Sequence, residues 1–514
     1  MSYIYLLMRF WAAHPALTHA IALLLGACLY LKNSFIFCLP IFCLWIPMLL
    51  LISQRQFEAL KILAINVLVF LTGWFFTANQ AVFPSAQLMG KAGIAQIKIK
   101  SIALQQTVFG QRWAYKCELQ KFQTGASATS ILRNIPCYIF LPALQMRPIA
   151  DSAYWVNGSL INLENGVYVL KVKSKEAWRK IPSTWSAAET RYYYKQKVKE
   201  WIQAHLILPG SATFLAGLAT GEFDDFWMRQ QFARFGLQHL LAISGFHFSI
   251  LASCLNFLFR LIFTRPWRIL LVVSFLTSFC VFIGPQASIM RTWIMSALAL
   301  GGEFCAKKSN PLNCLGVALF AIIAYDPLII LELAFQLSFA ATAAILLCFQ
   351  PAQDIINYLM PKRTLINVVQ MNGWGQHAYC LLIFIQQGLA LTLAINLIVL
   401  PITLYYFHEF PVMSIFFNLF FPFLASLALS LLIFSILLAW IPWVSALVHA
   451  INDQYTNFLI QLIYQTPHTL DAYLKINGLS LALLLTYLCC ICLIAIIWQQ
   501  RRFKEEGGCW YGLI

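Results

Sequence analysis

The sequence predicts a polytopic α-helical membrane protein with a small, OB-like β domain inserted outside the membrane. Of its 514 residues, 61% are hydrophobic and only 11% are charged, and the mean hydropathy is +0.73. A soluble domain could not bury that much apolar surface. Apolar segments close to the ~20 residues that cross a bilayer recur along the chain. One polar stretch with strand-like alternation divides these segments into two groups.

Three apolar segments open the chain, at 16–31, 34–52 and 60–77. The first follows Arg9 and is similar to a signal peptide, but it shows no clear small-residue cleavage site and further segments follow closely. We therefore expect a retained helix and an N-terminal transmembrane domain over residues 1–80.

The polar stretch that follows has the pattern of a β domain, assigned to residues 81–180. Apolar and polar residues alternate with period 2, which is typical of half-buried strands. The alternating segments lie around 97–100, 113–120 and 168–173, and two dipeptides typical of hairpin turns, Asn157-Gly158 and Asn165-Gly166, lie between or beside them. Several short strands in this length suit an OB-like barrel, which binds single strands with a basic groove and stacked aromatic rings.

The candidate DNA-binding residues of the β domain are Lys98, Lys100, Trp113, Tyr115, Lys116, Lys171 and Lys173. The alternative is a folded extracytoplasmic loop whose lysines only keep one face solvated. Cys117 and Cys137 are the only cysteines of this stretch. They form a disulfide if the stretch faces an oxidising compartment and stay free thiols otherwise.

A helical linker, residues 181–235, connects the β domain to the second group of apolar segments. Its helix, from about 187 to 208, interleaves aromatic and basic residues, among them Tyr192, Lys195 and Trp201. Such a helix usually lies on the membrane surface. Stacking of its aromatic rings on DNA bases is the second interpretation.

The second membrane block covers residues 236–500, and a basic tail, 501–514, follows it. Its apolar segments lie at 239–263, 267–284, 287–304, 311–325, 329–349, 380–406, 413–440 and 479–498. Polar residues interrupt one more segment, 443–465, which either crosses the membrane or lies along its interface.

The positive-inside rule orients these segments. The net charge of +16 fits either a polyanionic partner or basic cytoplasmic loops, so the positions of the cations matter more than their sum. Basic clusters fall on alternate connections, at Arg9, at 55–61, at 260–268, at 307–308 and at 362–363. We therefore expect the N-terminus inside the cell and the β domain outside. The side of the C-terminus depends on the number of crossings after about residue 412, which the sequence leaves open.

The polar residues of the second block are candidates for the working centre. His239, Ser244 and His247 stand at the start of an apolar run, where each ionisable group costs roughly 2.5–3.5 kcal/mol on insertion scales. Eight residues of unbroken helix would separate the histidines by about 12 Å, too far to share a zinc ion. Without an acidic residue in the segment, a hydrolytic triad is not expected either.

Further polar candidates in this block are Ser288, Arg291, Gln336, Ser338 and Asn418. Arg291 stands at the mouth of an apolar helix, where it either contacts a phosphate or extends to the interface. Gln336 and Ser338 could equally hold helices together. Near Asn418, prolines break the helical pattern, which is tolerated beside protein or a water-filled cavity.

These motifs resemble the ComEC/Rec2 competence family, whose members form the inner-membrane channel for single-stranded DNA in natural transformation. The resemblance covers nearly the full length. It rests on the string from Gly236 to His247, and on Gly217-Leu218, Gly221, Ser288, Arg291, Asp326-Pro327, Phe335 to Phe339, Pro401, Pro411 and Asn418. It implies a cell inner (cytoplasmic) membrane protein that spans the membrane many times.

Three departures from the family pattern matter. The family's Gly-Asp-Arg is Gly221-Glu222-Phe223 here, so an expected basic contact is missing. Its Arg-Ala is Arg291-Thr292, which keeps the arginine. Many relatives also carry a C-terminal metallo-β-lactamase-like domain, whereas no HxHxDH string follows the last segment here. We therefore expect no nuclease in this polypeptide.

The sequence thus predicts a DNA channel rather than an enzyme, without a cofactor or a bound metal. The expected DNA path runs along His239, Ser244, His247, Ser288, Arg291, Gln336, Ser338 and Asn418. The resemblance implies single-stranded DNA, membrane lipid, a DNA receptor outside and a cytoplasmic helicase or ATPase as partners, with a separate nuclease as a further option. The alternative is a proton-coupled transporter of a small solute that uses His239, Glu332 and Gln336. A purely structural membrane protein is the third interpretation.

Overall fold

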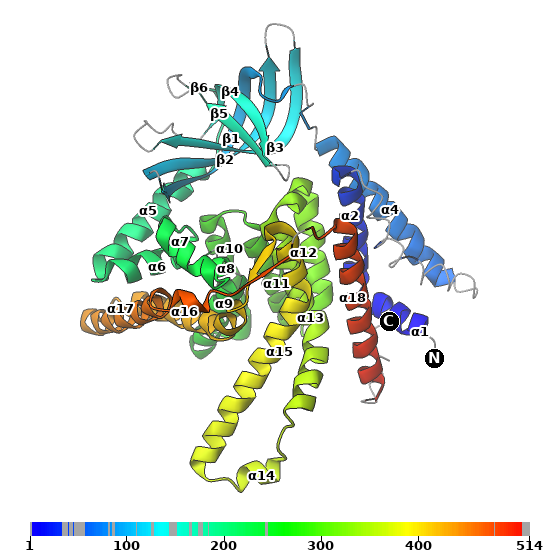
Figure 1. The fold of residues 1–514 in the computed structure, drawn as a ribbon, viewed down its shortest axis with the longest axis vertical. Helices are drawn as coiled ribbons and strands as arrows, with labels where there is room; N and C mark the ends of the chain where they lie inside the picture. The colour runs from blue at the N-terminus through cyan, green and yellow to red at the C-terminus, as the bar shows by residue number, and fades with distance from the viewer. Residues whose placement is uncertain are drawn as a thin grey trace.

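The computed structural model describes residues 3–32, 40, 45, 57–80, 83–84, 88–108, 110–124, 128–142, 152–163, 167–172, 178–182, 184–241, 245–476 and 478–505. It is mostly helical, with the β domain at one end of the helices (Figure 1). Within the described residues, seven helices are long and apolar enough to cross a membrane. The chain is therefore a multi-pass membrane protein, as predicted.

The N-terminal domain contains α1 (Tyr3–Ala13), α2 (Pro15–Lys32) and α4 (Phe57–Gln80). Helices α2 and α4 agree with the first and third predicted segments, and they lie next to each other. Glycines allow this close approach, since a Cβ on Gly73 would lie 2.5 Å from the Leu23 carbonyl oxygen of α2. Apart from residues 40 and 45, the predicted segment 34–52 lies outside the described residues.

The β domain is a ring of five strands with a short sixth. The strands are β1 (Ala92–Thr107), β2 (Gly110–Thr124), β3 (Ala128–Pro142), β4 (Ala153–Leu163), β5 (Val167–Val172) and β6 (Arg179–Lys180). Their order is β1-β2-β3-β5-β4-β6, and β1 also pairs with β4, which closes the first five strands on themselves. All pairs are antiparallel except β3 with β5. Closure removes the exposed sheet edges on which other chains could pair.

The predicted period-2 alternation is confirmed by burial in this domain. Ile97, Ile99 and Leu119 are fully buried inside the ring, and Lys98 and Lys116 project from its other face. Side chains of successive strand residues point to opposite faces, so the buried set is the one that the alternation predicts.

One turn prediction was wrong. Asn157-Gly158 lies within β4, where Gly158 pairs with Gly93 of β1 and Val172 of β5. A Cβ on Gly158 would lie 2.6 Å from the Lys171 carbonyl oxygen, so this glycine serves close strand approach rather than a turn. The other dipeptide, Asn165-Gly166, lies outside the described residues, between the antiparallel strands β4 and β5.

The linker and the first half of the second membrane block form a series of helices. They are α5 (Ala188–His205), α6 (Pro209–Thr220), α7 (Phe226–Arg234), α8 (Gln238–Leu241), α9 (Gly245–Ile262), α10 (Arg265–Ile283), α11 (Ala287–Phe304) and α12 (Pro311–Tyr325), followed by the 3-10 helix η3 (Pro327–Leu331). The predicted segment 239–263 is described in two parts, α8 up to Leu241 and α9 from Gly245, and residues 242–244 lie outside the described residues.

The second half contains the longest helices. They are α13 (Leu333–Leu359), α14 (Leu365–Val369), α15 (Gly373–Phe407), α16 (Ser414–Leu437), α17 (Pro442–Tyr464) and α18 (Leu481–Glu505), with the small strands β7 (Glu409–Pro411) and β8 (Tyr473–Lys475) and the 3-10 helix η4 (His468–Leu470). Helices α13 and α15 form a long hairpin with α14 at its tip (Figure 1). Helix α17 is not among the candidate spans.

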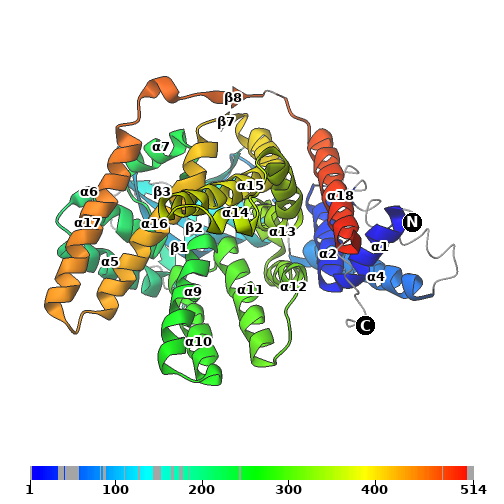
Figure 2. The same cartoon turned by 90° about the horizontal axis from the view of Figure 1, so that it is seen from below.

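The first and last described helices of the chain are neighbours. Helix α18 packs against α1, and the two lie side by side (Figure 2). Arg502 near the end of α18 pairs with Asp354 of α13, and Gln499 donates hydrogen bonds to the carbonyls of Leu346 and Leu347. Pro351 in α13 has no N–H for the Leu347 carbonyl, so Gln499 satisfies an acceptor that the proline leaves free.

Candidate functional site

The sequence string around His239 folds as a turn, a short helix and the start of α9. Gly236 has φ +64°, and a Cβ there would lie 2.7 Å from the Ser414 Cβ at the start of α16. Both the left-handed backbone and the close approach require glycine. The turn thus holds α8 and the beginning of α9 against α16.

Gly245, the first residue of α9, brings this string against α11. A Cβ on Gly245 would lie 2.5 Å from Arg291 Nη2 and would also collide with Thr292 Oγ1. The Arg291 guanidinium therefore packs directly on the α9 backbone. The sequence singled out Arg291 but did not reveal that Gly245 is its partner.

Arg291 is fixed on its other side by α13. Its Nε donates a hydrogen bond of 2.9 Å to Ser338 Oγ, and Nη1 lies 3.9 Å from Met295 Sδ. The side chain is only half-buried. In the part of the chain that the structure describes, no carboxylate forms an ion pair with it. Within the described residues, its positive charge is therefore not neutralised by a carboxylate.

The two histidines of the string have different environments. His239 is exposed, and its Nδ1 lies 3.1 Å from the Gly236 carbonyl oxygen, whereas His247 is 1% exposed. They are close enough to interact electrostatically. Ser244 lies outside the described residues.

The remaining predicted path residues do not all join this group. Ser288 lies in the first turn of α11, and its carbonyl accepts a hydrogen bond from Thr292. Gln336 instead accepts a hydrogen bond of 2.8 Å from Tyr406 Oη and donates to the Ile330 carbonyl. Asn418 on α16 has a buried Oδ1 without a partner among the described residues. The structure thus brings together Arg291, Ser338 and Gly245, which we call the arginine cluster.

The predicted DNA-binding face of the β domain requires correction. Tyr115 is fully buried in the core of the domain, and Trp113 is partly buried with its ring edge-on to Tyr192 at 5.9 Å. The Tyr115 ring is therefore not free to stack on a base, whereas the Trp113 ring keeps some exposed surface. Alternation placed Tyr115 on a strand face, but it could not show that this face was the closed interior of the ring.

Two of the predicted lysines are paired with carboxylates. Lys100 lies 2.7 Å from Glu118 on the neighbouring strand, and Lys116 pairs with Glu332, just before α13. Burial is the largest single influence on the pKa of Lys116 and lowers it, but Glu332, Tyr138 and Asp326 together raise it, so the net shift is upward. Lys171 is exposed, Lys98 is half-buried, and Lys173 lies outside the described residues.

The ion pair of Lys116 also bears on the transporter alternative. Glu332 accepts a hydrogen bond from Lys116 of the β domain, while Gln336 accepts one from Tyr406. The His239 ring instead lies beside the Gly236 carbonyl. The described structure therefore does not join His239, Glu332 and Gln336 in one proton-coupled site.

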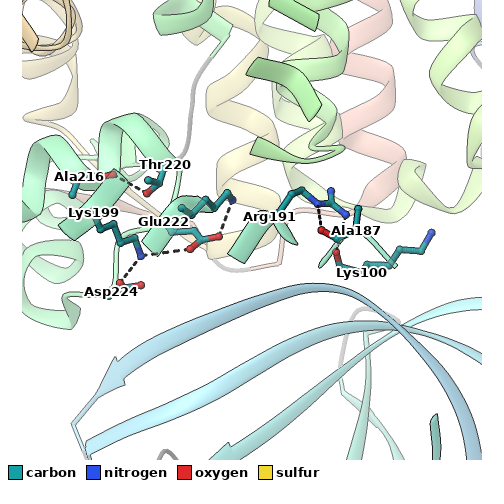
Figure 3. A network of polar contacts seen from close by, with 9 residues as sticks. Lys100, Ala187, Arg191, Lys199, Ala216, Thr220, Glu222 and Asp224 are labelled. Atoms are coloured by element: carbon teal, nitrogen blue, oxygen red, sulfur yellow. Dashed lines mark hydrogen bonds and ion pairs between the residues drawn. The ribbon is translucent and has the colours of Figure 1, made fainter. Parts of the chain in front are cut away.

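A buried charge network connects the linker to the β domain (Figure 3). Lys195 and Lys199 on α5 are 4% and 6% exposed. Lys195 donates to Glu222 at 2.7 Å, and Lys199 donates to Asp224 at 2.6 Å and lies 3.5 Å from Glu222. Burial lowers the pKa of Lys195 and raises the pKa of Asp224, although each faces an opposite charge.

The sequence did not predict this network. Its only signals were lysines four residues apart on α5 and the acidic residues after Gly221. At the position where the family pattern has arginine, Phe223 packs on Gly217. Two hydrogen bonds extend the network to Gln106 of β1. The Gln106 N–H donates to the Asp224 carbonyl at 3.0 Å, and the Arg229 side chain donates to the Gln106 carbonyl at 3.1 Å.

Cys117 and Cys137 are directly opposite each other on β2 and β3. Both are buried free thiols in the structure. Burial and the neighbouring Cys137 raise the pKa of Cys117 well above its ordinary range. The disulfide stays a prediction.

Comparison with known proteins now adds to this geometry. The Competence protein family matches residues 223–501, which is more than half of the chain and includes the arginine cluster. The chain is also 26% identical over 215 residues to ComE operon protein 3 of Bacillus subtilis (strain 168). That alignment covers 41% of this chain and 24% of the relative. No solved structure matches the chain.

Proposed function

This chain belongs to the Competence protein family, and from that premise we propose that it conducts single-stranded DNA across the cytoplasmic membrane during natural transformation. The family and the Bacillus relative support a role in DNA uptake for competence. The candidate spans support a path through a membrane.

The Arg291 environment is the observation that carries the proposal. A DNA phosphate binds best to a cationic side chain that is not already paired with a carboxylate of the protein. Charge-assisted hydrogen bonds between such a cation and phosphate are strong. Arg291 is held by Ser338 and Gly245 without a carboxylate among the described residues. The exposed imidazole of His239, which lies close to His247, offers a further polar contact on the proposed path. A cation in an apolar segment without a carboxylate partner among the described residues is costly, which favours a function over a purely structural role.

In this proposal the β domain is OB-like, lies outside the cell and meets the strand first. Its ring of five strands with a mixed order is compatible with a Greek-key barrel of the OB type. Lys98 and Lys171 have no carboxylate partner among the described residues and are the remaining candidates for phosphate contact. The basic loops between membrane segments, on the side of the membrane opposite the β domain, would then face the cytoplasm.

The proposed channel works without catalysis or a cofactor of its own. The sequence has no recognisable nucleotide-binding motif, so the pulling force would come from a cytoplasmic helicase or ATPase. A receptor outside would deliver DNA, and a separate nuclease is a further candidate partner.

The test is uptake of labelled DNA in a deletion strain that expresses variants of this chain. Arg291→Ala should leave DNA capture outside the cytoplasmic membrane intact and abolish entry into the cytoplasm. Arg260→Ala is the matched control, because Arg260 is an exposed arginine at the far end of α9. Protein abundance must be equal in all strains. Normal entry with abundant Arg291→Ala protein would contradict the proposed path.

A further inference from the structure

Two histidines that are far apart in the sequence meet between α5 and α17. His205 is the last residue of α5, and His449 lies near the start of α17. Their ring centroids are 5.3 Å apart. Trp201 lies one turn before His205 on α5 and packs against both imidazoles. Its ring centroid is 4.3 Å from that of His205 and 5.6 Å from that of His449.

A hydrogen bond fixes the tautomer of His205. Its Nδ1 lies 2.8 Å from the Trp201 carbonyl oxygen. A carbonyl only accepts hydrogen bonds, so Nδ1 carries the proton and Nε2 keeps a free lone pair. Metal-binding histidines are commonly held in this way by a backbone carbonyl. Since the side chain is exposed, an ion can reach it from solvent.

His449 is buried without a partner. It is 5% exposed, and neither ring nitrogen has a hydrogen-bond partner among the described residues. Buried polar groups are otherwise almost always hydrogen-bonded, so an orphaned imidazole needs an explanation. Burial, and then the neighbouring His205, lower the pKa of His449 below its ordinary 6.5. At neutral pH the ring is therefore in the neutral form that binds metals.

The spacing of the two rings suits one shared ion. Imidazoles bonded to a tetrahedral ion at about 2.0–2.1 Å hold their ring centres roughly 5 Å apart. We propose that His205 and His449 bind one divalent transition-metal ion, with Zn²⁺ as the best candidate. Imidazole suits zinc, copper and nickel, whereas calcium and magnesium require oxygen ligands.

The site has two protein ligands, and its other coordination positions are left to water or an external anion. Asp453, one turn after His449, accepts hydrogen bonds from the N–H groups of Ile207 and Leu208 and from Ser211, so it is already occupied at the start of α6. Among the described residues, no group of three or more His, Cys, Asp and Glu could hold a metal. The sequence predicted no metal because no motif connects residues 205 and 449.

A bound ion would join two parts of the protein. Helix α5 carries the charge network that contacts β1, and α17 packs on α16 in the second membrane block. An ion that binds only the folded arrangement stabilises the contact between the two helices.

Metal titration of the purified full-length protein tests the proposal. Wild-type protein should bind one equivalent of Zn²⁺, and Co²⁺ should give a spectrum without thiolate charge transfer. His205→Gln and His449→Gln should each weaken Zn²⁺ binding by tenfold or more and remove the Zn²⁺-dependent rise in Tm. His377→Gln, at an exposed histidine near the start of α15, should bind like wild type.

The exposed position of His205 keeps the test decisive even if His449→Gln fails to fold. Unchanged affinity in folded His205→Gln protein would overturn the proposal. A Co²⁺ spectrum dominated by thiolate charge transfer would also overturn it, because the ion would then be held by cysteines. The absence of saturable Zn²⁺ binding to wild-type protein would do the same.

Discussion

Lys116 on β2 donates a hydrogen bond to Glu332, the residue that precedes α13, although the two are 216 positions apart. The pair connects the β domain directly to the second membrane block. A lysine that the sequence assigned to DNA is therefore neutralised by a carboxylate of its own chain. A DNA phosphate at this position has to compete with Glu332.

Breaking this pair should loosen the β domain. We expect Glu332→Gln to reduce the stability of the contact by about 0.5–1 kcal/mol, because both side chains are partly exposed. Hydrogen exchange of β2 amides should rise in this variant. The charge swap Lys116→Glu with Glu332→Lys should restore protection. Equal exchange in wild type and Glu332→Gln would show that the pair does not hold the domain.

Gly245→Ala should impair the arginine cluster without removing any functional group. The new Cβ would collide with Arg291 and Thr292, and such overpacking typically costs about 1–3 kcal/mol. DNA entry should fall at least tenfold while DNA capture persists. Gly301→Ala on α11 is the control, because a Cβ there meets nothing within 4 Å. Wild-type entry in Gly245→Ala cells would show that the guanidinium position is not critical.

The lysines without carboxylate partners should govern any DNA affinity of the β domain. Replacing Lys98 and Lys171 by alanine should weaken binding of single-stranded oligonucleotide to the full-length protein and lower the salt dependence by about one to two counterions. Tyr115→Phe should bind like wild type, because the ring is fully buried. A strong binding defect in a folded Tyr115→Phe protein would contradict the assigned core position.

Acidification should destabilise the contact of α5 with α17 through His449. Burial lowers the pKa of His449 in the folded protein below its ordinary 6.5. The unfolded state therefore takes up a proton first as pH falls, and folded-state stability is lost below about pH 6.5. Metal-free wild type should lose more Tm between pH 7 and pH 5 than His449→Gln. The opposite ranking would mean that the imidazole is protonated in the folded protein.

Several features followed from the sequence because they depend on local periodicity. Apolar runs of bilayer length predicted α2, α4 and α10 to within a few residues, and alternation identified the buried face of β1 and β2. These patterns reflect which environment each side chain needs, and they require no knowledge of distant partners. The same logic failed at Asn157-Gly158, where a turn dipeptide serves close strand packing instead.

By itself, the sequence determined the membrane class, the inserted β domain and the polar residues worth testing. Only the tertiary structure decided which of these residues meet. It put Arg291 against Gly245 and Ser338, paired Lys116 with Glu332, enclosed Tyr115 and joined His205 to His449. Burial and periodicity are properties of one segment, whereas a charge or an imidazole takes its role from partners that the fold brings from elsewhere in the chain.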